Sequence, residues 1–331
     1  HVRSRRQRQM CIRDRIIDYK TFENNILKMK EFVLNNNVKL RPHAKMHKSV
    51  DVAKYQIDNG GAHGICCQKL SEAEIFVRAG IKDILITNQI TDTFKLERLA
   101  KIVSKELKIG CCVDNEENII NIQKAVERNN SIIDIYIEYD CGANRCGVKS
   151  FNEINELIKM IKKMANLNFI GFQAYNGSIQ HIEDHKTRQI QVKNTCNKIR
   201  ELKDTFIKHS PFITGVGTGC FDLEVNEEVY DEIQVGSYAF MDAHYSSLKH
   251  DRKLNNSNNF ENSLFILTGV MSKALQKHAV VDAGLKSIAV DSGLPKTINS
   301  ELEYIKCSDE HGIIADPYNI LKINDLSLIH I

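Results

Sequence analysis

The stretch that decides the fold is GAHGICCQKLSEAEIFVRAGIKDILITNQ, residues 61–89. Residues 61–67 and 83–89 are short apolar runs that end in polar side chains, as buried strands often do. Between them, apolar residues recur at the three- and four-residue spacing of a helix over residues 70–79, and Gly80 follows as a stop signal. The stretch therefore predicts a strand, a helix and a second strand in succession.

The same alternation extends from residue 16 to about residue 243. The predicted strands are residues 38–45, 61–67, 83–89, 108–114, 132–140, 168–175, 212–219 and 232–240. Helices are also predicted at 21–34 and 151–164. Eight strands that alternate with helices indicate an α/β fold, a closed (β/α)8 TIM barrel. An open doubly wound sheet is disfavoured, because no GxGxxG turn follows the first strand.

Beyond residue 243 a polar loop is followed by short β-type runs, which predict an all-β C-terminal domain. We expect residues 1–15 to be a non-native segment, 16–242 to form the barrel, and 243–331 to form a truncated β domain. Residues 1–15 are rich in arginine and lack apolar periodicity, and we also read residues 326–331 as non-native.

Composition limits the classes of protein that this chain can represent. With 42% hydrophobic and 26% charged residues among 331, the chain can bury a sizeable core, which excludes collagen, coiled coil and disorder. The net charge is +3, and residues 1–15 supply six Arg and one Asp, so the remainder carries −2. We therefore expect no nucleic acid and no membrane partner, although a basic RNA-binding arm at residues 1–15 is an alternative.

The compartment is inferred from the absence of membrane and export signals. No apolar run approaches the roughly 18 residues of a membrane span, and the N-terminus lacks the apolar block of a signal peptide. The ten cysteines contain no CxxC pair, and most are expected to pack in the core as small apolar residues. We expect a cytoplasmic protein.

The end of the first predicted strand carries the residue of greatest chemical interest. In RPHAKMHK, residues 41–48, alternation along an extended segment would place His43, Lys45 and His47 on one face. Chemistry in such barrels lies at the C-terminal ends of strands. A lysine whose pKa is lowered by desolvation there could form a Schiff base, whereas the alternative is a solvated basic strand end.

The last two predicted strands end in groups suited to an anion. TGVGTG at 214–219 and VGSY at 235–238 offer backbone N–H groups and the hydroxyls of Thr218 and Ser237. Barrels commonly bind phosphate after strands 7 and 8. Either glycine cluster alone could be only a turn, but the two together favour a phosphate site.

Two other strand ends carry candidate residues. Arg145, in the segment after the fifth strand, could bind an anionic oxygen, or it could be an ordinary surface arginine. The sixth strand ends at Tyr175 and is followed by His181 and His185, which would share a face if that segment were helical. Two histidines without a third ligand do not define a metal site, so the metal ligands stay unknown.

Four motifs carry a resemblance to a known family: RPHAKMHK (41–48), GICCQKLSEAE (64–74), GFQAYNGS (171–178) and SDEHG (308–312). The sequence resembles the D-threonine aldolase, 3-hydroxy-D-aspartate aldolase and D-serine dehydratase family of alanine racemase-type (fold type III) pyridoxal phosphate enzymes. The likeness extends from about residue 16 to residue 325, with the motifs in the same order.

The resemblance implies roles for individual residues. Lys45 would hold pyridoxal 5′-phosphate as a Schiff base, and His47 or Lys45 itself would act as the base. Arg145 would contact the ring oxygen and Tyr175 would lie beside the ring. The phosphate would be bound by Thr218, Gly236, Ser237 and Tyr238.

The implied reaction is retro-aldol cleavage of a small β-hydroxy-D-amino acid, D-threonine or 3-hydroxy-D-aspartate, to glycine and an aldehyde or glyoxylate. The alternatives are a D-serine or 3-hydroxy-D-aspartate dehydratase, a non-catalytic protein of pyridoxal phosphate homeostasis, and a phosphate-binding sugar aldolase. The resemblance further implies a homodimer and a divalent metal, manganese or magnesium. Family members carry metal ligands in a segment beyond residue 325, where this sequence diverges, so weak activity is expected.

Overall fold

The computed structural model describes residues 14–104, 106–248 and 260–330. By its internal contacts the chain divides into two units. One contains the described residues of 26–238 together with residue 248, and the other contains 14–25, 239–247 and 260–330. The domain boundary expected at residues 242 and 243 thus falls inside a segment that belongs to the second unit.

The first unit is built on an eight-stranded parallel sheet, as the alternation predicts. Its strands are β2 (Lys39–Leu40), β3 (Ile65–Cys67), β4 (Asp83–Ile86), β5 (Lys108–Val113), β6 (Ile133–Glu138), β7 (Leu167–Ala174), β8 (Phe212–Gly215) and β9 (Glu232–Ile233). They pair in the order β2-β9-β8-β7-β6-β5-β4-β3. Parallel bridges Leu40–Ala62 and His43–Cys66 join the two ends of this order and close the barrel.

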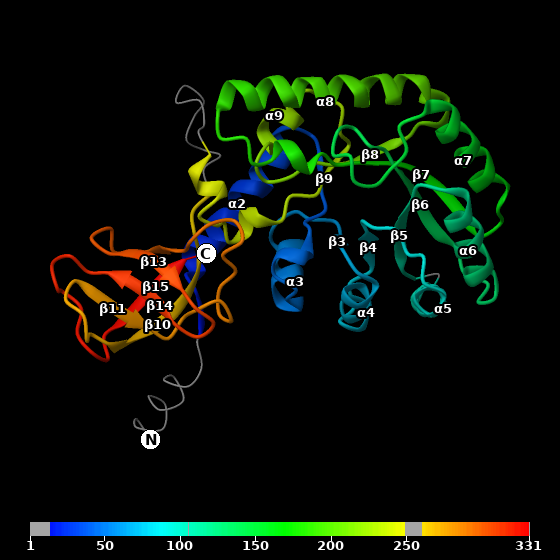
Figure 1. Cartoon of the computed structure of the whole chain (residues 1–331). Helices are drawn as coiled ribbons and strands as arrows, with labels where there is room; N and C mark the ends of the chain where they lie inside the picture. Colours follow the sequence, from blue (N-terminus) through cyan, green and yellow to red (C-terminus); the bar gives the residue numbers. More distant parts are fainter. Residues whose placement is uncertain (1–13, 105, 249–259, 331) are drawn as a thin grey trace. The chain divides into compact units, whose positions relative to one another are not determined.

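Helices alternate with these strands and lie on the outer side of the curled sheet (Figure 1). They are α2 (Tyr19–Asn35), α3 (Val50–Asp58), α4 (Leu70–Arg78), α5 (Thr93–Ile102), α6 (Glu116–Glu127), α7 (Phe151–Lys163), α8 (His185–Thr205) and the short α9 (Phe221–Val225). Side chains set several of their starts. Ser49, Asp92 and Ser150 each accept a hydrogen bond from an amide in the first turn of the helix that follows.

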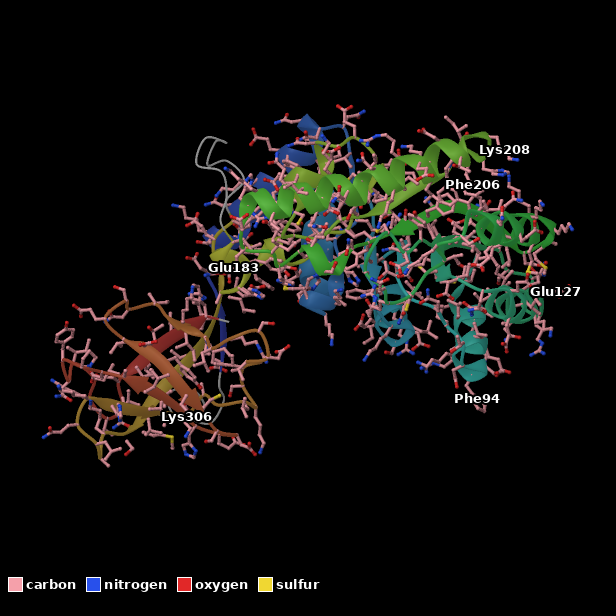
Figure 2. The ribbon with its side chains drawn as sticks, turned by 45° about the horizontal axis from the view of Figure 1, so that its top comes forward. Phe94, Glu127, Glu183, Phe206, Lys208 and Lys306 are labelled. Carbon is pink, nitrogen blue, oxygen red and sulfur yellow. The ribbon has the colours of Figure 1, made fainter. Side chains whose placement is uncertain are left out.

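Apolar packing holds the helices to the sheet. Phe206, near the end of α8, lies 5.8 Å from Phe172 of β7 and 5.9 Å from Phe151 of α7 between ring centroids. In Figure 2 Phe206 lies at this end of α8, whereas Phe94 projects from the start of α5 and is exposed. The described cysteines fit the predicted role, because seven of the nine are buried free thiols.

A buried ionic network joins residues in or next to four strands of the barrel, β2, β3, β4 and β9. Arg41 donates from Nε to Glu232 at 2.9 Å and pairs with Asp83, and His63 lies 2.8 Å from the same Glu232 carboxylate. Burial would raise the pKa of Glu232, but the Arg41 charge and His63 outweigh it and hold that pKa below its usual value. Because Arg41 is buried and paired here, it belongs to the scaffold and not to the strand-end chemistry.

The second unit is an antiparallel β domain, as predicted. Its strands are β1 (Arg15–Ile17), β10 (Leu264–Ser272), β11 (His278–Val281), β12 (Lys296–Thr297), β13 (Glu303–Cys307), β14 (Gly312–Ala315) and β15 (Leu326–His330). Residues that we set aside as non-native take part in it, since β1 and β15 both pair with β10. Ile329 of β15 is buried in the domain core.

Candidate active site

Lys45 lies on a tight turn, and this corrects the prediction of an extended strand to residue 45. The strand β2 ends at Leu40, and residues 44–46 form a single 3-10 turn. The cause is a local cap, because His43 Nδ1 accepts a hydrogen bond from the Lys45 amide at 3.3 Å. The placement of His43, Lys45 and His47 on one face of an extended segment is therefore wrong.

His43 is also held through its second ring nitrogen, Nε2. Since Nδ1 accepts from a backbone amide, the hydrogen of the neutral ring is on Nε2, which lies 3.0 Å from Thr87 Oγ1. Thr87 in turn donates to the Cys67 carbonyl. Burial, and then the Lys45 charge, lower the pKa of His43 well below its usual value. His43 is thus a neutral side chain that orients the lysine turn.

The structure brings Lys45, Tyr175 and Arg145 together, although they come from different strand ends. Lys45 Nζ lies 5.9 Å and Arg145 Cζ 5.8 Å from the centroid of the Tyr175 ring. The Lys45 side chain is exposed at the barrel mouth, yet enough protein surrounds its ammonium that desolvation, followed by the Arg145 charge, lowers the pKa of Lys45. A lysine in this state is a better nucleophile than an isolated surface lysine.

The site also contains Glu138, the last residue of β6, which no sequence motif had indicated. Its carboxylate is buried, lies 3.6 Å from Arg145 and accepts a hydrogen bond from Gln89 Nε2 at 2.6 Å. Burial raises the pKa of Glu138 despite these partners. The only sequence signal was an acidic residue in an apolar strand, which did not indicate that Arg145, seven residues later, would fold back onto it.

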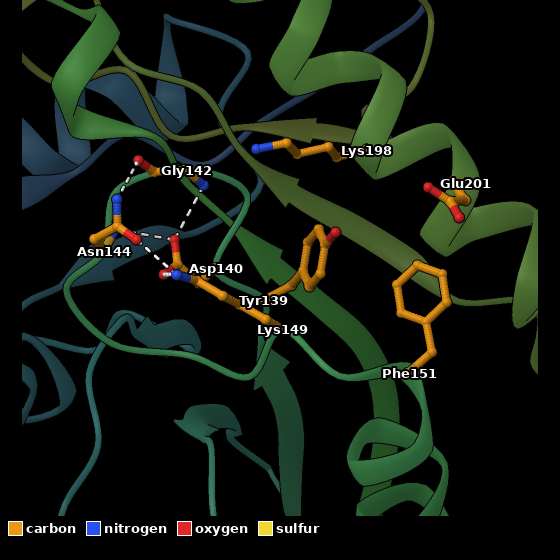
Figure 3. A pocket seen from close by; sticks show the side chains of 8 residues that line it. All are labelled: Tyr139, Asp140, Gly142, Asn144, Lys149, Phe151, Lys198 and Glu201. Carbon is orange, nitrogen blue, oxygen red and sulfur yellow. Dashed lines mark hydrogen bonds and ion pairs between the residues drawn. The ribbon is translucent and has the colours of Figure 1, made fainter.

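The loop that carries Arg145 is organised by Asp140 (Figure 3). Asp140 Oδ1 accepts from the Gly142 and Asn144 amides, each at 3.0 Å, and Lys149 Nζ lies 3.4 Å from Oδ2. Burial would raise the pKa of Asp140, but these amides and Lys149 hold it below its usual value. These residues border a pocket of about 510 Å³ that also contacts α7 and α8. These contacts stabilise the turn at which the Arg145 loop begins.

The predicted phosphate-binding residues lie on the loops after β8 and β9. The segment after β9 runs beside the lysine turn, because His43 N donates to Val235 O. Gly236 is required there, since a Cβ would approach the His43 carbonyl to 2.7 Å. Thr218 is buried, yet among the described residues neither its hydroxyl nor that of Ser237 has a hydrogen-bond partner. Hydroxyl donors without an internal partner on these loops can donate to an anionic group.

Tyr238 and His47 lie in a buried polar cluster with Gln56. Gln56 Nε2 donates to the Tyr238 hydroxyl at 3.1 Å. His47 Nδ1 accepts from the Ser49 amide at 3.0 Å, while His47 Nε2 and Gln56 Oε1 are buried without a partner in the described part of the chain. Burial lowers the pKa of His47 to about 4. His47 is therefore neutral at pH 7, with a pKa below that of an ordinary histidine.

The two candidate metal-binding histidines do not share a helix face. His181 precedes α8 in an irregular segment, and His185 is the first residue of that helix. Residues 14–104, 106–248 and 260–330 contain no group of three or more His, Cys, Asp or Glu side chains arranged to hold a metal ion. The described residues therefore do not fit a metal centre.

Comparison with known proteins places the chain in a family. Residues 17–244 match the model "Alanine racemase, N-terminal domain", and residues 263–326 match "Putative serine dehydratase domain". The chain is 43% identical to 3-hydroxy-D-aspartate aldolase of Paracoccus denitrificans (strain Pd 1222), covering 94% of this chain and 81% of that protein. It is 38% identical to D-threonine aldolase of an Arthrobacter species, covering 90% and 78%.

The solved structures agree. D-threonine aldolase from Filomicrobium marinum superposes with a TM-score of 0.90 at 34% identity, covering 96% of this chain and 85% of that one. No helix in the described part of the chain is long and apolar enough to span a membrane. The chain belongs to the D-threonine aldolase, 3-hydroxy-D-aspartate aldolase and D-serine dehydratase family of alanine racemase-type enzymes.

Proposed function

We propose that this protein is a pyridoxal phosphate-dependent lyase that cleaves a β-hydroxy-D-amino acid, D-threonine or 3-hydroxy-D-aspartate, to glycine and an aldehyde or glyoxylate. The observation that carries the proposal is the grouping of Lys45, Tyr175 and Arg145 at the barrel mouth. The relatives that are aldolases by name support the same reaction.

The residues present fit the cofactor. Lys45 would hold it covalently, Tyr175 would lie against the ring and Arg145 would bind the ring oxygen. The hydroxyls of Thr218 and Ser237 and the Gly236 and Tyr238 segment would bind the phosphate. When bound, pyridoxal phosphate supplies the electron sink for breaking the Cα–Cβ bond.

The protein must accept the proton of the substrate β-hydroxyl. We assign this role to Lys45 Nζ, because its pKa is lowered while the side chain stays exposed to the barrel mouth. His47 is the weaker candidate, since its Nε2 is buried and its pKa is about 4. A manganese or magnesium ion is implied by the family resemblance, but we assign it no step, because the described residues offer no cluster to hold it.

A dehydratase acting on D-serine or 3-hydroxy-D-aspartate is the second candidate, favoured by the match of residues 263–326 to a putative serine dehydratase domain. Incubation with D-threonine, 3-hydroxy-D-aspartate and D-serine separates the two. The aldolase predicts glycine from the first two substrates, and the Lys45→Ala variant should release none. Pyruvate and ammonia from D-serine without any glycine would establish the dehydratase.

Two finer features belong to the same proposal. We infer a homodimer, to be tested by light scattering of the purified holoenzyme, and a cytoplasmic location, to be tested by cell fractionation. A monomer in solution would refute the first, and recovery in a membrane or secreted fraction would refute the second.

A further inference from the structure

The loop after β8 rests on two buried side chains that the proposed reaction does not use. Gln180 Oε1 accepts from the Gly219 amide at 3.0 Å, and Glu224 Oε2 accepts from the Gly217 amide at 3.5 Å. Gln180 Nε2 also donates to Glu224 Oε2 at 3.1 Å, which links the two supports. A side chain at position 217 would approach Gln180 Oε1 to 2.4 Å. The Gly217 and Gly219 amides, on either side of Thr218, are therefore held in place by these two buried side chains.

The hydrogen bonds around Glu224 are all satisfied when its carboxyl is protonated. Tyr230 has one hydroxyl hydrogen and two acceptors in reach, Ala174 O at 3.2 Å and Glu224 Oε1 at 3.3 Å. A hydrogen on Glu224 Oε1 can go to the Tyr230 oxygen, which leaves the Tyr230 hydrogen for Ala174. Oε2 then remains free to accept from Gln180 and Gly217.

The surroundings also disfavour a charge on Glu224. Its side chain is fully buried and has no ion-pair partner in the described part of the chain. The titratable groups that face it from the neighbouring elements are Tyr175, Cys141, Cys196, Tyr230 and, on its own segment, Cys220 and Asp222. None of these is a cation. The buried Arg188 of α8 acts on the adjacent Cys220, and its guanidinium donates to the carbonyls of Ile182 and Glu183. Burial raises the pKa of Glu224 to about 7, although Gln180, Gly217 and Tyr230 oppose the shift.

We propose that Gln180 and Glu224 are positioning residues that hold residues 217–219 in the phosphate-binding conformation, with Glu224 acting as a neutral carboxylic acid. This inference rests on the proposed function, because it takes the loop after β8 as the phosphate site. A phosphate dianion at Thr218 and a buried carboxylate beneath it would repel each other. Ionisation of Glu224 and binding of the phosphate therefore oppose one another.

The test uses pyridoxine 5′-phosphate, which cannot form a bond with Lys45, and pyridoxine, which lacks the phosphate. Calorimetry of the full chain at pH 6.5, 7.5 and 8.5 measures the affinity for both. The variants are Glu224→Gln, which keeps the shape and is neutral at every pH, and Glu224→Ala, which removes the support. The control is Glu228→Gln, the same chemical change at an exposed position four residues later.

We expect wild type and Glu228→Gln to lose roughly tenfold or more in affinity for pyridoxine 5′-phosphate between pH 6.5 and 8.5, relative to Glu224→Gln, as Glu224 ionises. The ligand phosphate itself titrates near pH 6, but this affects its binding to all four proteins in the same way and therefore cancels when their affinities are compared. Glu224→Ala should bind the phosphate ligand roughly tenfold more weakly than Glu224→Gln at pH 6.5. Pyridoxine should bind all four proteins alike.

Three outcomes overturn the inference. Parallel pH profiles of wild type and Glu224→Gln would show that the charge on Glu224 does not matter. Equal losses for pyridoxine and its phosphate in Glu224→Ala would indicate a general structural role. If wild type binds the two ligands equally tightly, the phosphate site is absent, and the proposed function fails together with the inference.

Discussion

The Thr218 hydroxyl offers the sharpest mutational test of the phosphate site. Thr218 is 8% exposed, and its hydroxyl has no hydrogen-bond partner in the described part of the chain. Thr218→Val keeps the shape of the side chain and removes the donor. Because no intraprotein hydrogen bond is lost, the melting temperature of the cofactor-free protein should not change. Only the bond to a phosphate oxygen should disappear.

The size of the effect follows from the chemistry of that bond. A hydrogen bond to a charged group contributes about 1.5–3 kcal/mol. At about 1.4 kcal/mol for each factor of ten, Thr218→Val should weaken binding of pyridoxal phosphate roughly 10- to 150-fold. Combination with Ser237→Ala should weaken it further, whereas Thr218→Ser, which retains the hydroxyl, should stay close to wild type.

Equilibrium titration followed by cofactor absorbance measures these affinities. Pyridoxal, which lacks the phosphate, serves as the internal control and should bind wild type and Thr218→Val equally. If Thr218→Val binds pyridoxal phosphate as tightly as wild type, or loses the same factor for pyridoxal, the phosphate does not contact Thr218 and the assignment is refuted.

Two further predictions concern charge. Arg145→Gln removes a positive charge that lowers the pKa of Lys45, so the midpoint for Schiff-base formation with pyridoxal phosphate should move to higher pH in an absorbance titration. An unchanged midpoint would show that the Arg145 charge does not act on Lys45. In the β domain, Asp316 accepts hydrogen bonds from Lys273 and from the Ile320 and Leu321 amides, so Asp316→Asn should lower the free energy of unfolding by about 1–3 kcal/mol in urea titrations at pH 7. Burial would raise the pKa of Asp316, but these hydrogen bonds outweigh it and lower that pKa. The difference in unfolding free energy between wild type and Asp316→Asn should therefore shrink as the pH falls through the lowered pKa. A difference that does not vary with pH would contradict this explanation.

Periodicity predicted the barrel because each strand and helix is a local pattern. The helix over 70–79 appears as α4, and that over 151–164 as α7, each within one residue at its end. The apolar runs at 108–114 and 132–140 contain β5 and β6. In all four cases the signal, alternation or three- and four-residue spacing, depends only on neighbouring residues.

Strand ends were predicted less well, because tertiary and side-chain contacts decide them. The segment 38–45 forms only the short strand β2, since the His43 cap turns the chain at Ala44. The segment 232–240 likewise leaves the sheet after Ile233 and enters a 3-10 turn at Ser237. No periodicity reports a hydrogen bond between a side chain and a backbone amide.

Contacts between distant residues lie outside sequence reasoning for the same reason. Glu138 approaches both Arg145 and Gln89, the latter 49 residues earlier. Lys45, Arg145 and Tyr175 were predicted to lie at or after strand ends, which a closed barrel brings to one mouth, but the contacts among these three side chains leave no trace in local pattern.

The most direct measurement identifies the lysine that binds the cofactor. The protein is incubated with pyridoxal phosphate, reduced with borohydride, digested and mapped by mass spectrometry. We expect the reduced cofactor to be attached to Lys45, and we expect Lys45→Ala to lose the label. Attachment to Lys48 or Lys69 in the wild-type protein would contradict this assignment.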